Sequence, residues 1–82
     1  MYYTYIIYDS KHSEFYIGVT LDLMRRRKIM YHQKPGCKIV YYEEFDNSEE
    51  ATRRENILLN LSKSLLKELI SENNPMWVDL MQ

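Results

Sequence analysis

Residues 2–8 read Tyr-Tyr-Thr-Tyr-Ile-Ile-Tyr, and residues 14–18 read Glu-Phe-Tyr-Ile-Gly. Both runs consist mainly of β-branched and aromatic residues and are too short for a convincing helix, so each predicts a β-strand. The connection between them, residues 9–13, is polar and predicts a turn. Two strands joined in this way are typical of an antiparallel hairpin with a longer loop. The hairpin is therefore the first part of the predicted sheet.

A helix and a third strand are predicted after the hairpin. Thr20 or Asp22 can cap the helix, because either side chain can accept hydrogen bonds from the unpaired amides of a first turn. The helix runs to about His32, and the sequence Lys-Pro-Gly at residues 34–36 closes it. Residues 37–45 are again rich in β-branched and aromatic residues, and they predict a third strand of the same sheet.

Two further helices are predicted in the second half of the chain. Asn47, with Glu50 three residues later, resembles a capping box and opens a helix over residues 48–61. Ser62 caps the next helix, in which large aliphatic residues recur at helical spacing until Asn-Asn-Pro at residues 73–75 ends it. The expected fold class is α+β, with a small three-stranded sheet and about three helices.

Length and composition limit the kind of protein. With 82 residues the chain is too short for two independent cores, so residues 1–82 are expected to form a single domain. The single cysteine, Cys37, cannot form an internal disulfide, which fits a reducing compartment. No apolar stretch approaches the roughly 20 residues that span a bilayer, and the N-terminus lacks the pattern of a signal peptide. A soluble cytoplasmic protein with no membrane partner is expected.

Charge is distributed unevenly along the chain. The net charge is −1, which supplies no global attraction to nucleic acid. One basic run is present, formed by Arg25, Arg26, Arg27 and Lys28, and three lysines are candidates for the same surface: Lys11, Lys34 and Lys38. Acidic residues gather at residues 43–50. A local basic surface is therefore the candidate for contacts with phosphate groups.

Glu55 fits worst into a purely structural account. It stands within the apolar face of its predicted helix, four positions after Ala51 and three positions before Leu58. An unpaired carboxylate at such a place would be costly. Either a salt bridge, for example to Arg26, or a metal ion would stabilise the ionised form. Periodicity alone does not choose between structural pairing and metal binding.

Other candidate residues also have ordinary structural explanations. Strand alternation places Tyr5 on one face of its strand, and it places Tyr16 and Gly18 together on one face of the next. Tyrosine is, however, a common strand residue, and Gly18 could be a plain turn glycine. Arg26 lies at the edge of the apolar stripe of its helix, where the aliphatic stem could cover the core while the guanidinium group stays in water.

In order and spacing, these positions resemble the GIY-YIG nuclease family, especially its compact stand-alone members. The second half of the family motif is present as Tyr16-Ile17-Gly18. Eleven residues before Tyr16, Tyr5 keeps the functional position of the first half, in which Tyr3-Thr4-Tyr5 replaces Gly-Ile-Tyr. Arg26, eight residues after Gly18, matches the family's arginine, and Glu55 matches its metal-binding glutamate. The resemblance extends to the strand at residues 41–45 and to Asn-Pro-Met-Trp at residues 74–77.

Two departures from the family pattern concern the site. Arg27 stands where compact members usually carry an apolar residue, so Arg25 and Arg27 stay open as alternatives for the functional arginine. Family members often carry a histidine four residues after that arginine, whereas Met30 holds this position here and His32 lies two residues further on. No assisting role is therefore assigned to His32.

The resemblance implies a three-stranded antiparallel sheet flanked by helices, across which Tyr5, Tyr16, Arg26 and Glu55 converge. It also implies an endonuclease that hydrolyses phosphodiester bonds in DNA, structure-directed in repair or recombination, with RNA as a further candidate substrate. Glu55 would bind a single Mg²⁺ or Mn²⁺, and Arg26 would stabilise the transition state. Tyr5 is the expected general base and Tyr16 its orienting neighbour, although the two roles could be exchanged.

Two other functions stay open. One is a catalytically weak or inactive nucleic-acid-binding module of the same fold, which would place the basic run at residues 25–28 on phosphates. The other is a protein-interaction domain with a tyrosine-rich surface, which would have no affinity for nucleic acid. For a nuclease, specificity is expected to come from structure-directed recognition, from a homodimer or from a partner protein.

Overall fold

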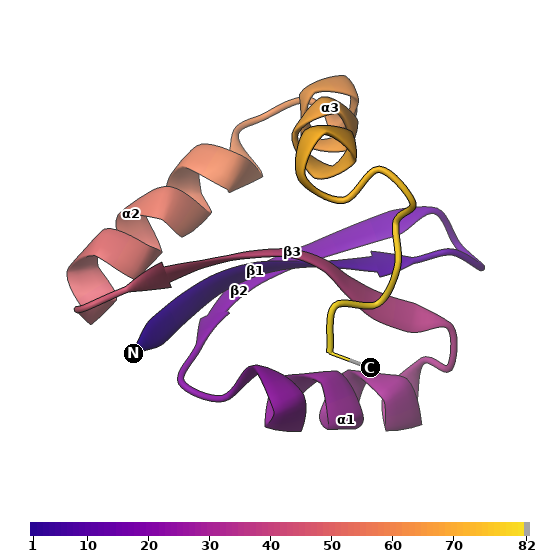
Figure 1. Ribbon diagram of the computed structural model, residues 1–82, viewed down its shortest axis with the longest axis horizontal. Helices are drawn as coiled ribbons and strands as arrows, with labels where there is room; N and C mark the ends of the chain where they lie inside the picture. The colour runs from indigo at the N-terminus through magenta and orange to yellow at the C-terminus, as the bar shows by residue number, and fades with distance from the viewer. Residues whose placement is uncertain (82) are drawn as a thin grey trace.

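The computed structural model describes residues 1–81 and shows three strands and three helices in an α+β arrangement (Figure 1). The strands are β1 (Tyr2–Asp9), β2 (Glu14–Thr20) and β3 (Cys37–Phe45), and the helices are α1 (Leu23–Gln33), α2 (Ser48–Leu59) and α3 (Lys63–Asn73). The predicted order and type of these elements are confirmed. β2 extends two residues beyond its predicted end, and α2 ends two residues earlier than predicted. None of the described helices is long and apolar enough to span a membrane.

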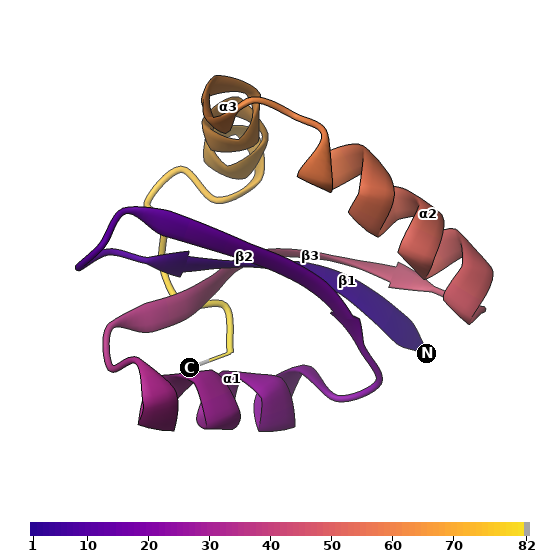
Figure 2. The same cartoon turned by 180° about the vertical axis from the view of Figure 1, so that it is seen from behind.

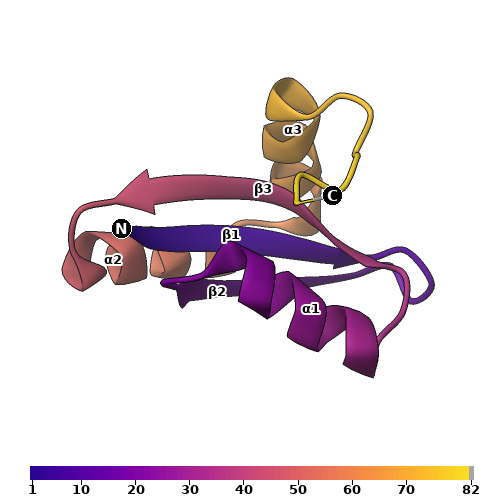
Figure 3. The ribbon, with the colours of Figure 1, turned by 60° about the horizontal axis from the view of Figure 1, so that its bottom comes forward.

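β1 is the central strand of an antiparallel sheet with the strand order β2-β1-β3 (Figure 3). Residues 4–7 of β1 are all buried, because helices cover both faces of the sheet. α1 lies on one face, and α2 and α3 lie on the other, as views from opposite sides both show (Figures 1 and 2). The molecule therefore has three layers and a core on each side of the sheet.

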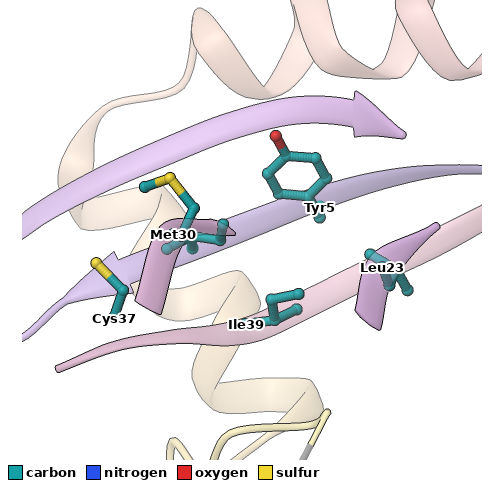
Figure 4. Close-up of a cluster of buried hydrophobic side chains, with 6 residues drawn as sticks. Tyr5, Leu23, Met30, Cys37 and Ile39 are labelled. Carbon is teal, nitrogen blue, oxygen red and sulfur yellow. The ribbon is translucent and has the colours of Figure 1, made fainter. Parts of the chain in front are cut away.

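The two cores draw on alternate residues of the central strand. The core on the α1 face is formed by Tyr5, Ile7, Leu23, Met30, Cys37 and Ile39 (Figure 4). The core under α2 and α3 is formed by Ile6, Val40, Tyr41, Leu58, Leu66 and Ile70. Successive side chains of a strand point to opposite faces, so Tyr5 and Ile7 face α1 while Ile6 faces α2 and α3.

A β-bulge interrupts the alternation in β3. Ile6 pairs with Tyr41 and Ile7 pairs with Ile39, so Val40 is the extra residue. Val40 and its neighbour Tyr41 both lie in the core under α2 and α3, whereas Ile39 faces α1. The bulge thus lets two adjacent residues of one strand fill the same core.

Side-chain caps fix where the three helices begin. The Asp22 carboxylate accepts a hydrogen bond from the Arg25 amide at 3.1 Å, so Asp22 rather than Thr20 is the N-cap of α1. Asn47 and Ser62 cap α2 and α3 in the same way, as predicted. Each cap satisfies one of the amides that a first turn leaves unpaired.

The segment after α3 returns across the sheet to the edge formed by β3 (Figure 1). The Leu80 amide donates to the Ile39 carbonyl oxygen at 2.9 Å, and an Asp79 carboxylate oxygen accepts from the Ile39 amide at 3.4 Å. The buried Asn74 side chain donates to the carbonyl oxygen of Val40 at 3.1 Å. This C-terminal segment therefore covers the part of the β3 edge that contains the bulge.

Candidate active site

Tyr5 and Gly18 are paired across β1 and β2. The Tyr5 side chain lies over the glycine: a Cβ atom added to Gly18 would lie 2.8 Å from Tyr5 Cζ and would overlap the hydroxyl oxygen. Figure 4 shows the ring reaching from β1 toward the neighbouring strand, with its hydroxyl group at the far end. Gly18 lies inside β2, so the interpretation as a turn glycine is wrong. A residue without a side chain is needed there because the tyrosine ring approaches the backbone.

Arg26 on α1 contacts the hydroxyl end of Tyr5. Arg26 Nε donates a hydrogen bond to the Tyr5 hydroxyl oxygen at 2.8 Å, and the guanidinium carbon lies 5.9 Å from the centre of the ring. Within residues 1–81 the two terminal nitrogens of Arg26 make no hydrogen bond. They form a planar pair of donors that suits the oxygens of a phosphate group.

The two neighbouring arginines are placed differently. Arg25 is exposed, and only its backbone amide takes part in the cap of α1. Arg27 Nε donates to an Asp79 carboxylate oxygen at 2.8 Å, and its guanidinium carbon lies 5.3 Å from the centre of the Tyr31 ring. Of the three candidates for the functional arginine, Arg26 is therefore the one that meets Tyr5.

Tyr16 lies two residues before Gly18 on β2 and packs against the core on the α1 face. Its hydroxyl group donates to a Glu14 carboxylate oxygen at 2.7 Å and accepts a hydrogen bond from the Lys34 ammonium group at 2.5 Å. The hydrogen bond to Tyr16 raises the pKa of Lys34 above its ordinary value, because it favours the charged ammonium form. No hydrogen bond joins Tyr16 to Tyr5 or Arg26 within the described residues.

Glu55 lies on α2, which packs against β1 and β2 on the face opposite to α1 (Figure 3). It is half-buried between Ala51 and Leu58, both fully buried, as its helical spacing predicts. The Glu55 carboxylate makes no hydrogen bond or ion pair with any residue between 1 and 81. The salt bridge to Arg26 considered from the sequence is not formed, and no hydrogen bond or ion pair among residues 1–81 joins Glu55 to Tyr5, Tyr16 or Arg26. The carboxylate is left open to a ligand.

The arginine next to Glu55 belongs to a separate network. Arg54 Nε donates to a Glu43 carboxylate oxygen at 2.8 Å, and the same carboxylate accepts a hydrogen bond from the Tyr41 hydroxyl group. Burial, together with the hydrogen bond to Glu43, raises the pKa of Tyr41 above its ordinary value. Arg54 is therefore no partner for Glu55, and Glu43 is already engaged.

A metal ion at Glu55 would receive one carboxylate from the protein. In the described part of the chain, no three histidine, cysteine, aspartate or glutamate side chains are grouped to hold a metal. A single carboxylate fits Mg²⁺ or Mn²⁺, since both prefer oxygen ligands and Mg²⁺ usually keeps several waters. Cys37 is buried in the core on the α1 face, and burial raises the pKa of its thiol, which disfavours the thiolate that binds metals.

The basic surface is centred on α1. Arg25 and Lys28 are exposed on this helix, and Lys34 lies at its C-terminal end. The prediction that Lys38 shares this surface is wrong, because its ammonium group donates to the Trp77 carbonyl oxygen at 2.8 Å. Trp77 packs in the core under α2 and α3. Arg26 and Lys34 therefore contact the two tyrosines, and Arg25 and Lys28 are further exposed cations of the same helix.

Two hollows on the surface have volumes of about 250 and 260 Å³. The first is lined by Tyr3, Leu21, Asp22, Leu23, Met24, Tyr42, Glu44 and Met81, and the second by Phe45, Glu50, Arg53, Arg54 and Ile57. Neither is lined by Tyr5, Tyr16, Arg26 or Glu55.

Sequence reasoning missed two residues around the site. Strand alternation places Glu14 on the same face as Tyr16, but it does not show that the Glu14 carboxylate accepts a hydrogen bond from the tyrosine hydroxyl group. The sequence around Asp79 does not indicate its partners, because Arg27 and Ile39 lie 52 and 40 residues away in the chain. Contacts over such separations follow from the fold alone.

Comparisons with known proteins bear on the family and on the fold. A profile of the GIY-YIG catalytic domain matches residues 1–69. The chain is also similar to a UPF0213 protein from Bacillus halodurans, whose structure was determined by solution NMR. The two share 27% sequence identity with a TM-score of 0.65, over 94% of this chain and 90% of that one. Among curated proteins, no match reaches significance.

Proposed function

Because the chain belongs to the GIY-YIG family, we propose that it is a divalent-metal-dependent endonuclease that hydrolyses phosphodiester bonds in DNA. The observation that carries the proposal is the contact of Arg26 with Tyr5 over Gly18, which combines an arginine and a phenol beside the basic helix α1. Residues 1–82 would act as one nuclease domain in the cytoplasm. The cutting would be structure-directed, in repair or recombination, and would be carried out by a monomer, a homodimer or a complex with a partner protein.

Arg26 would bind the scissile phosphate. Its Nε atom is held by Tyr5, which fixes the orientation of the guanidinium plane, and its terminal nitrogens can donate to two phosphoryl oxygens at once. Charge that builds on these oxygens during attack would be stabilised by donors already in place. A lysine could not reproduce this, because it offers a point charge rather than a planar pair of donors.

Glu55 would hold the metal ion. One Mg²⁺ or Mn²⁺, when bound there, supplies positive charge for a phosphoryl oxygen and for the leaving oxygen. Glu55 is half-buried and has no protein partner among residues 1–81, so its carboxylate is free to accept this role. The residue contributes binding and orientation of the ion through one carboxylate.

Tyr5 would act as general base toward the attacking water, and Tyr16 would orient that water. Tyr5 is preferred for this role because Arg26 Nε donates to its hydroxyl oxygen at 2.8 Å, which puts the phenol beside the group proposed to bind the phosphate. Tyr16 has a lysine at its hydroxyl group instead, so the reverse assignment of the two roles is tested in the same experiment.

The test is a cleavage panel with purified protein. Duplex, branched and single-stranded DNA and RNA are incubated with Mn²⁺, with Mg²⁺ and with a chelator. We expect metal-dependent cutting that falls by at least about 100-fold in Glu55→Ala and Arg26→Ala, in line with loss of a charge that stabilises the transition state. Tyr5→Phe should lose more activity than Tyr16→Phe. Glu68→Ala, which alters an exposed glutamate on α3, is the matched control.

The outcomes separate the competing functions. Unchanged cutting by both Glu55→Ala and Arg26→Ala would point to a contaminating nuclease and remove the proposal. Salt-sensitive binding without cutting on any substrate would instead favour a binding module of the same fold. Absence of any affinity for nucleic acid would leave a protein-interaction domain.

A further inference from the structure

Lys34 and Tyr16 form a pair of hydrogen-bond donors beside the outer strand β2. The Lys34 ammonium group lies 2.5 Å from the Tyr16 hydroxyl oxygen and 4.9 Å from the centre of the ring. The Tyr16 hydroxyl group in turn donates to a Glu14 carboxylate oxygen at 2.7 Å. An anionic group is therefore already bound at this tyrosine, close to a lysine.

Glu14 is held there weakly. It is exposed, it is the first residue of β2, and it makes no ion pair with any residue between 1 and 81. The attraction between the Glu14 carboxylate and the Lys34 ammonium group acts through solvent at the surface, where such interactions contribute little. A stronger anion could therefore take the place of the carboxylate.

We propose that the Lys34 ammonium group, held in place by its contact with Tyr16, binds a backbone phosphate of the substrate next to the phosphate that Arg26 contacts, and that the Glu14 carboxylate stands in for this phosphate in the free protein. Phosphate and carboxylate oxygens accept the same hydrogen bonds, and lysine side chains donate to backbone phosphates of nucleic acids. The subsite rests on the proposed function, because it would position the same nucleic-acid chain.

The separation of the two phosphate contacts supports this assignment. Gly18 is paired with Tyr5, and the Tyr5 hydroxyl group is bound by Arg26, so the Arg26 contact lies beside Gly18. Tyr16 lies two residues earlier than Gly18 on the same face of β2. A strand rises about 3.4 Å per residue, so the two places are about 7 Å apart along β2. Neighbouring phosphates of one nucleic-acid chain have a comparable spacing. The bound chain would run along β2.

Binding without metal tests the subsite independently of cleavage. Affinity for a fluorescently labelled DNA duplex is measured by anisotropy between about 50 and about 200 mM salt. Losing one phosphate contact should flatten the slope of log affinity against log salt by about 0.9. Over this salt range, the factor by which the affinity falls should therefore be about 3.5 times smaller for Lys34→Met than for the wild type. Lys34→Arg should restore the slope. Lys67→Met, which removes an exposed lysine on α3, should leave it unchanged.

Glu14→Gln tests the competing anion. It should bind the duplex about two- to fivefold more tightly than the wild type at low salt, because the carboxylate no longer occupies the subsite. Circular dichroism of each variant checks that the fold is kept.

The results distinguish failure of the subsite from failure of the nuclease. A Lys34→Met slope equal to that of the wild type and Lys67→Met would overturn the subsite, even if the wild type cuts DNA. Weaker binding by Glu14→Gln would overturn the role of Glu14. The expected slopes without cleavage on any substrate would keep the subsite and reject the nuclease, whereas a wild type that does not bind nucleic acid would reject both.

Discussion

At the scale of single residues, the Tyr5 side chain makes two contacts that limit which residues can stand beside it. Its ring lies over Gly18 on β2, and its hydroxyl oxygen accepts a hydrogen bond from Arg26 on α1. The ring thus connects the sheet to the helix that carries the basic run. A change at either contact should alter the position of the phenol.

Gly18→Ala should lower the free energy of unfolding by about 1–3 kcal/mol, because the new Cβ atom would overpack against the Tyr5 ring. Urea denaturation of the wild type and the variant measures the loss. The matched comparison is the same substitution in a Tyr5→Leu background, where the shorter side chain leaves the space and the cost of the alanine should be smaller. An equal cost in both backgrounds would show that the ring does not create the requirement for glycine.

Asp9 should make stability depend on acid pH. Burial tends to raise the pKa of this carboxyl group, but hydrogen bonds from the His12 side chain and the Lys11 amide outweigh burial and hold its pKa below the ordinary 3.8. A group whose folded-state pKa is lowered contributes stability that is full above the unfolded value and is lost as the pH falls through the folded value. The stabilisation by Asp9 should therefore begin to decline at about pH 4 and be lost as the pH falls through the lowered pKa of the folded state.

Thermal denaturation of the wild type and Asp9→Asn between roughly pH 6 and pH 2 measures this effect. The two proteins should differ most at the upper end of the range, and the difference should shrink as the pH falls. A constant difference over the whole range would mean that Asp9 acts through its shape and not through its charge.

At the scale of elements, local signals were sufficient for the order of strands and helices. Asn47 and Ser62 lie immediately before their helices, and a cap of this kind is read from the residue type and its position. The bulge at Val40 could not be predicted in this way. Strict alternation would place Ile39 and Tyr41 on one face, but the pairing with β1 and the segment after α3 decide which face each one takes.

The same limit applies to the candidate site. The spacing of Tyr5, Tyr16 and Gly18 was enough to place them around adjacent strands, and helical periodicity was enough to find Glu55 between buried neighbours. The partners of these residues depend on how helices pack on the sheet. The hydrogen bond between Arg26 and Tyr5, and the one between Lys34 and Tyr16, join residues 21 and 18 positions apart.

Asp79→Ala should weaken the attachment of α1 to the C-terminal segment. Asp79 accepts hydrogen bonds from Arg27 on α1 and from the amides of Ile39 and Met81, so its loss should cost about 1–3 kcal/mol of unfolding free energy. Hydrogen exchange should become faster at the amides of α1 and of the C-terminal segment. Asp46→Ala, at an exposed aspartate after β3, is the matched control. Unchanged exchange in α1 would show that the ion pair does not hold the helix.

At the scale of the whole molecule, opposite charges are separated although the net charge is −1. The cations of α1 lie on one side of the sheet, and the acidic residues at 43–50 lie at the end of β3 and the start of α2. A polyanion would therefore be attracted locally and repelled elsewhere, which favours one orientation on the protein.

Arg25→Gln combined with Lys28→Gln should weaken DNA binding and flatten its salt dependence by up to about 1.8, since each phosphate contact in duplex DNA contributes about 0.9 to the slope. Both residues are exposed, so stability should change by less than about 0.5 kcal/mol. Anisotropy over a salt series and urea denaturation measure the two quantities. Lys63→Gln combined with Lys67→Gln, on α3, is the control. Equal slopes for the two double variants would exclude α1 from the nucleic-acid interface.

The strand order β2-β1-β3 also bears on how the protein behaves in concentrated solution. The C-terminal segment covers part of the β3 edge, whereas β2 pairs only with β1 in the described structure. An unpaired strand edge is a template on which a second copy can add, and charged side chains near it discourage such pairing. Arg26 and Lys34 carry positive charge beside β2. Removing both charges would therefore favour aggregation through the β2 edge. A nucleic acid lying along this strand would cover the edge and keep the protein soluble.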